Sequence, residues 1–111
     1  MDKAIILFDK LIESIPTIER KGKTTPYTSV NGHMFSFLSK DGKMGLRLSE
    51  SERENFIEKY NSKLMEQHGR IMKEYVEVPD DLLEDTNSLL PFLKLSFDYV
   101  SSLKPKPTKK K

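Results

Sequence analysis

The chain has 111 residues and contains no cysteine. This absence excludes disulfide bonds, cysteine nucleophiles and zinc sites built from thiolates. No stretch approaches the ~18 consecutive apolar residues that a membrane-spanning helix requires. The first residues also lack the charged and apolar regions of a secretory signal. We therefore expect a cytoplasmic protein that does not associate with membranes.

Glycine and histidine are also scarce. The five glycines are isolated, so none of them builds a phosphate-binding loop, and no segment has the oxygen-ligand pattern of an EF-hand. The two histidines, His33 and His68, lie far apart in the sequence and lack the spacing of a zinc site. Either could act as a general base beside a carboxylate, but neither has a nucleophile motif near it. We expect no catalytic residue, no cofactor and no bound metal.

Positive charge is concentrated at the C-terminal end of the chain. The formal net charge is +2, yet residues 49–103 contain twelve acidic and six basic residues. The last eight residues, KPKPTKKK, contain five lysines and no acidic residue. Their composition predicts a disordered Lys/Pro tail over 104–111. We assign 1–103 to a single domain, because one domain typically has roughly 100–150 residues.

Two groups of charged residues are candidate interaction sites. The lysines of the tail can contact nucleic acid or an acidic surface; they are Lys104, Lys106, Lys109, Lys110 and Lys111. Asp80 and Asp81 begin an acidic cluster, which continues with Glu84 and Asp85 and can bind a cation or a basic partner. A solvated helix start is the simpler interpretation of this cluster, because acidic side chains stabilise the first turn of a helix.

Hydrophobic periodicity predicts the order helix, three strands, helix, one or two strands, short helix and long helix. The expected elements are a helix over 4–15, a polar loop over 17–26, strands near 27–30, 34–38 and 44–48, a helix from Ser49 to Asn61, strands near 64–65 and 71–78, a short helix after Pro79, and a last helix from Asn87 or Ser88 to Lys104. The fold class is therefore α+β, with an antiparallel sheet of about four to five strands covered by helices.

Short polar motifs mark the ends of these elements. Asn-Gly at 31–32 and Asp-Gly at 41–42 are typical of tight hairpin turns, so the first three strands should form an antiparallel meander. The Ser/Glu pattern at 49–52 predicts a capping box at the start of the middle helix. Pro91 should lie in the first turn of the last helix, where its missing amide costs little.

Three features of the strands concern their packing. Phe35 and Phe37 should lie on one face of the sheet, under the first and last helices. Gly45 lies inside a strand, which indicates the close approach of a packed helix or of a ligand or partner chain. Glu74 and Glu77 fall on opposite faces of their strand, a pattern that an edge strand would tolerate.

Several motifs in the second half of the chain match a known family. They are GKM at 42–44 and LRL at 46–48 before a Ser/Glu-capped helix, and GRIMKEYVEVP at 69–79 before an acidic short helix and an amphipathic last helix. In these features, residues 4–104 resemble the N-terminal domain of the TfoX/Sxy proteins, which are associated with natural competence in bacteria.

This resemblance implies a bacterial α+β domain with an antiparallel sheet backed by helices and no known catalytic residue. The sequence departs from the family where Met34-Phe35 is followed by Ser36-Phe37, since family members often have a glycine pair there. It also shows no counterpart of the helix-rich second domain of the two-domain competence regulators. We therefore expect a stand-alone single-domain member.

Three functions are compatible with these observations. The leading hypothesis is a small non-enzymatic interaction module with a regulatory role and a protein partner. The alternative is weak nucleic acid binding through the basic tail, and the second alternative is an enzyme with a histidine and carboxylate site. The protein partner can also be a second copy of this chain, which would form a homodimer.

Overall fold

The computed structural model describes residues 2–22, 25–67 and 69–103. These residues form four helices and five strands: α1 (Asp2–Glu13), β1 (Tyr27–Val30), β2 (His33–Leu38), β3 (Met44–Arg47), α2 (Glu50–Tyr60), β4 (Leu64–Gln67), β5 (Arg70–Val78), α3 (Asp80–Glu84) and α4 (Thr86–Ser101). The predicted α+β class and element order are confirmed. Within the described ranges, no helix is long and apolar enough to cross a membrane.

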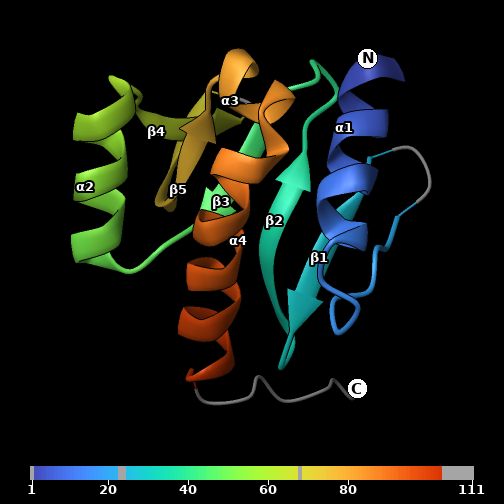
Figure 1. Cartoon of the computed structure of the whole chain (residues 1–111). Coiled ribbons are helices and arrows are strands. Elements are labelled where there is room, and N and C mark those ends of the chain that lie inside the picture. The colour runs from blue at the N-terminus through green and yellow to red at the C-terminus, as the bar shows by residue number, and fades with distance from the viewer. Residues whose placement is uncertain (1, 23–24, 68, 104–111) are drawn as a thin grey trace.

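The strands form one antiparallel sheet in the order β1-β2-β3-β5-β4. The helices lie together on one face of this sheet, so no helix of the described residues covers the opposite face (Figure 1). The predicted meander of the first three strands is confirmed, and positive φ angles of 55° at Asn31 and 80° at Gly32 suit the tight turn between β1 and β2. The prediction of an edge position for β5 is wrong, because β5 pairs with both β3 and β4.

A bulge in β2 separates the two phenylalanines that the sequence places on one face. Thr28 pairs with Ser36 while the next residue of β1, Ser29, pairs with Met34, so Phe35 is an extra residue. Such an insertion changes which face the following side chains occupy. Phe35 joins the core under the helices, as predicted. The prediction for Phe37 is wrong, because this residue lies on the uncovered face of the sheet, opposite Gly45.

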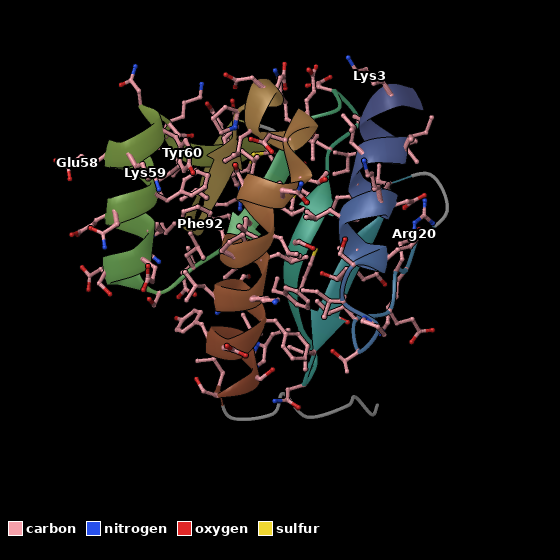
Figure 2. All side chains as sticks on the ribbon, viewed as in Figure 1. Lys3, Arg20, Glu58, Lys59, Tyr60 and Phe92 are labelled. Atoms are coloured by element: carbon pink, nitrogen blue, oxygen red, sulfur yellow. The ribbon has the colours of Figure 1, made fainter. Side chains whose placement is uncertain are left out.

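Aromatic rings attach α2 to α4. Phe56 is fully buried, and its ring centroid lies 4.9 Å from that of Tyr60 and 5.1 Å from that of Phe92 in α4. The ammonium group of Lys59 lies 5.5 Å from the Tyr60 ring centroid, and Figure 2 shows these labelled side chains between the two helices. Among the residues of α2, Phe56 is the buried one, so the helix depends on this ring for its attachment.

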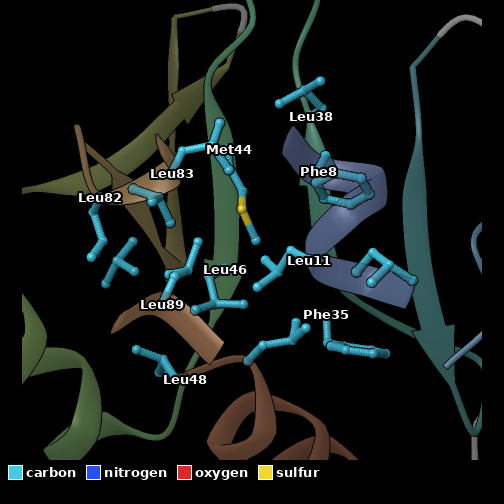
Figure 3. Close-up of a cluster of buried hydrophobic side chains, with 14 of the residues drawn as sticks. Phe8, Leu11, Phe35, Leu38, Met44, Leu46, Leu48, Leu82, Leu83 and Leu89 are labelled. Carbon is cyan, nitrogen blue, oxygen red and sulfur yellow. The ribbon is translucent and has the colours of Figure 1, made fainter. Parts of the chain in front are cut away.

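The core fills the space between the sheet and the helices (Figure 3). Its fully buried members come from every layer; they include Phe8 and Leu11 of α1, Phe35 of β2, Met44 and Leu46 of β3, Val76 of β5, and Leu89 and Leu93 of α4. Three polar side chains are also buried here, and each has a hydrogen bond: the hydroxyls of Thr28 and Ser36 bond to each other, and Ser96 Oγ donates to Phe35 O at 3.3 Å.

The helix ends differ from the predicted caps. Ser49 occupies the N-cap position of α2, but its side chain makes no capping hydrogen bond, so the predicted capping box is wrong. Asp85, rather than Asn87 or Ser88, caps α4, because its carboxylate accepts from the Ser88 amide at 3.4 Å and from the Ser88 hydroxyl at 2.7 Å. Since α4 begins at Thr86, Pro91 lies in the second turn and not in the first.

Candidate functional site

A hollow of about 1040 Å³ lies on the face of the sheet that the helices leave uncovered. Three parts of the chain surround it: Thr25 and Tyr27 before and in β1, the β2–β3 hairpin around 37–43, and the β4–β5 hairpin with residue 63 before it. Its floor residues are Tyr27, Met34, Phe37, Met65 and Met72. Its rim residues are Lys40, Asp41, Lys63, Glu66, Arg70 and Glu77.

A second bulge, in β5, brings two methionines to this floor. Leu64 pairs with Val76, whereas the next residue of β4, Met65, pairs with Met72, so residues 73–75 have no partner on β4. Regular alternation would place Met72 with Val76 on the helix side of the sheet. Because paired residues share a face, the bulge moves Met72 to the opposite side together with Met65. Both therefore line the hollow with Phe37.

Phe37 and Met65 are closely packed although they line a hollow, whereas Tyr27, Met34 and Met72 are half-buried. Phe37 keeps 6% of its surface exposed and Met65 keeps 1%. The ring of Tyr75 packs edge-on against Phe37 with centroids 5.6 Å apart, and its hydroxyl donates to Met34 O at 2.6 Å. Burial raises the pKa of this hydroxyl above its usual value, and Arg47 nearby opposes the rise. Tyr75 therefore stays protonated and fixes the position of β2 beneath the hollow.

Gly45 gives Phe37 the room to lie on the sheet. A Cβ atom at Gly45 would lie 2.3 Å from Cε1 of the Phe37 ring. The predicted close approach at Gly45 is therefore real, but its partner is the side chain of a neighbouring strand. The prediction of a packed helix at this position is wrong, and the alternative of a ligand or partner chain stays a prediction.

Replacing Gly45 by alanine is expected to lower the free energy of unfolding by about 1–3 kcal/mol, because the new methyl group overpacks the Phe37 ring. The loss should be smaller when Phe37 is also replaced by leucine, whose side chain can move away from the methyl group. A double-mutant cycle from urea denaturation measures this coupling, with an expected interaction of roughly 0.5–3 kcal/mol. Additive effects of Gly45→Ala and Phe37→Leu would show that the two positions do not conflict.

The rim carries charges of both signs that are not paired within the described residues. Lys40, Lys63 and Arg70 are exposed, and none of them takes part in the ion pairs found there. The same holds for the rim acids Asp41, Glu66 and Glu77. Unpaired charges around an apolar floor are available for a charged partner, although each exposed pair contributes at most about 1 kcal/mol.

The predicted interaction residues lie at the border of this hollow or beyond the described chain. Asp80 at the start of α3 forms an ion pair of 3.0 Å with Lys43, a residue that lines the hollow, and this hydrogen bond raises the pKa of Lys43. Asp81 is exposed beside it in α3. The five tail lysines, and with them the predicted disordered tail, fall outside the described residues.

The histidines and the acidic residues do not form a metal site in the part of the chain that can be described. His33 is the first residue of β2, and His68 falls outside the described residues. No group of at least three histidines or carboxylates that could hold a metal ion occurs in residues 2–22, 25–67 and 69–103. Sequence reasoning also missed Met34, Met65 and Met72, because only the two bulges bring them to one face.

Comparison with known proteins adds no relative. The sequence matches no known family model and no curated protein. The resemblance to the TfoX/Sxy N-terminal domain therefore stays a prediction, while the α+β fold rests on the structure itself.

Proposed function

We propose that this protein is a small non-enzymatic interaction module that binds a protein partner in the hollow on the uncovered face of its sheet. The observation that carries this proposal is the combination of an aromatic and methionine floor with rim charges that form no ion pair with another described residue. Methionine side chains are unbranched and polarizable, so they adapt to apolar groups of different shapes. Surfaces rich in methionine are accordingly used by proteins that bind several partners.

Two features favour a protein segment over nucleic acid as the occupant. Stacking of bases requires exposed aromatic faces, whereas of the two floor rings Phe37 is only 6% exposed and Tyr27 is half-buried. A polyanion would also meet the rim carboxylates Asp41, Glu66 and Glu77, which lie among the cations. A protein segment with an apolar side chain between charges of both signs complements this rim. The hollow thus supports protein binding better than it supports binding through phosphates.

The chemistry of the hollow supports binding rather than catalysis. The hydroxyl of Tyr75, which packs on the floor, is already engaged as a donor to Met34 O. The described lining residues contain neither a histidine nor a pair of buried carboxylates. A regulatory role, as the TfoX/Sxy resemblance suggests, is part of the same proposal, because such a module acts through the partner that it binds.

The proposal is tested by selecting peptides from a displayed random library on the full chain and by measuring their affinity for two variants. Met72→Lys puts a charge on the floor, whereas Ile71→Lys changes the adjacent residue, which is 62% exposed and does not line the hollow. We expect selected peptides to carry an apolar residue flanked by charges, and to bind Met72→Lys at least about tenfold more weakly than wild type, a loss of ~1.4 kcal/mol.

Ile71→Lys should bind these peptides as wild type does, since it is the matched control. Circular dichroism and urea denaturation verify that both variants are folded. No enriched peptide, or equal binding by wild type and Met72→Lys, would contradict the proposal.

A further inference from the structure

Among the described strands, the outer part of the β4–β5 ladder pairs only with itself, because the pairing of β5 with β3 covers Tyr75–Val78. We propose that residues 65–67 of β4 and 70–72 of β5, here called the flap, open locally and widen the hollow for the apolar side chain of a protein partner. The role of this motion in partner binding rests on the proposed function. The motion itself belongs to the free protein and can be measured without any partner.

The bulge in β5 provides the hinge. The inner part of β5 is held firmly, because Glu74 O accepts from Leu48 N at 3.1 Å and the following residues pair with β3. Residues 73–75 have no partner on β4. At the base of the flap, β4 is joined to β5 by the Leu64–Val76 pair and by the hydrogen bond from Glu77 N to Lys63 O, 2.9 Å long. Glu74 and Tyr75 are held by β3, so bending at Lys73 leaves the pairing of β5 with β3 intact.

Weak attachment of the flap favours such bending. Its six residues take part in none of the four ion pairs found between described residues. Its main apolar contribution is Met65, which is 1% exposed yet lies outside the large core under the helices. Parts of a protein with few buried apolar contacts open with free energies far below that of global unfolding.

Closure of the flap explains why Met65 is hidden although it lines the hollow. Phe37 and Met65 both line the hollow, but together they expose almost no surface. When the flap opens, Met65 leaves its buried position and the hollow becomes wider for an apolar side chain of a partner. The flap also carries Glu66 and Arg70, two of the unpaired rim charges, so a partner that pairs with them can hold the open form.

The absence of cysteine in the chain permits a direct test by thiol labelling. Three single-cysteine variants are compared: Met65→Cys on the flap, Met44→Cys in the main core at 0% exposure, and Ile71→Cys at 62% exposure. Met65→Cys and Met44→Cys remove the same atoms from buried positions, so they are matched. When reclosing is faster than labelling, the rate measures the population of the open form.

We expect Met65→Cys to react at least about tenfold faster than Met44→Cys and at least about tenfold more slowly than Ile71→Cys, because its thiol is exposed by local opening. Its rate should depend little on urea, whereas the rate of Met44→Cys should rise steeply, since global unfolding exposes far more surface. Equal labelling rates and equal urea dependences for Met65→Cys and Met44→Cys would show that the flap does not open locally. A labelling rate for Met65→Cys equal to that of Ile71→Cys would show that the flap does not close over residue 65.

Hydrogen exchange of the unmodified chain gives a second measurement that needs no variant. Amides of the flap should exchange before those of β3, with the same weak dependence on urea. Exchange of the flap together with β3 would contradict local opening. If the flap opens but no peptide is selected, the proposed function alone is refuted. Failure of the flap and failure of the proposed function are therefore distinguishable.

Discussion

Replacing Leu93 by alanine is expected to lower the free energy of unfolding by about 2–5 kcal/mol. Leu93 is fully buried in α4, the helix that contacts β1, β2 and β3 as well as α1 and α3. Truncation leaves a cavity between the helix and the sheet that the surrounding elements cannot fill without moving. A loss of this size matters, because small domains have a total stability of roughly 5–15 kcal/mol.

Urea denaturation of the wild type and two variants measures this effect. The control is Leu95→Ala, which removes the same atoms from the same helix at a position that is 37% exposed. It should cost less than Leu93→Ala, since more of its side chain already contacts water. Equal midpoints for the wild type and Leu93→Ala would show that α4 does not pack on the sheet as described.

The second large effect concerns the attachment of α2. Phe56→Ala should lower the free energy of unfolding by about 3–5 kcal/mol, as other losses of buried aromatic rings do. Phe56 is the buried residue of this helix, and its ring packs on Tyr60 and on Phe92 of α4. Without it, few apolar contacts hold α2 against the sheet. We therefore expect α2 to lose protection from hydrogen exchange earlier than α4.

Glu58→Ala is the control for this prediction. Glu58 is exposed on the same helix, so its replacement should change the stability by no more than ~0.5 kcal/mol. A Phe56→Ala variant as stable as Glu58→Ala would mean that the aromatic contact between α2 and α4 contributes little.

The sequence is sufficient for the fold where local signals agree with tertiary packing. Met44 and Leu46 alternate with polar residues, and both are fully buried under the helices, as a half-buried strand requires. The Asn-Gly pair at 31–32 fixes the first hairpin, because both of its residues adopt positive φ. Asn61 ends α2 in a left-handed conformation, at the predicted position.

The candidate site could not be predicted because it depends on bulges. A bulge is a tertiary feature: nothing in the residues around Phe35 or residues 73–75 marks the extra residue. Each bulge shifts the alternation that sequence reasoning assumes, so Phe37 and Met72 were assigned to the wrong face or left unassigned. The N-cap of α4 was also predicted at the wrong residue. Asp85 belongs to a run of acidic residues, and nothing in that run indicates that a new helix begins there.

The hydrogen bond between the β1–β2 turn and α4 indicates where a label or a linker can be attached for binding experiments. Asn31 Nδ2 donates to Ser101 O at 3.0 Å, so α4 ends beside the β1–β2 turn. The hollow includes the β2–β3 turn at the other end of β2, which for a strand of six residues is about 20 Å away. A fluorophore or a surface linker attached after Leu103 therefore starts from α4 on the helix-covered face, at the end of β2 away from the β2–β3 turn that borders the hollow. An attachment at Lys40, by contrast, would block it.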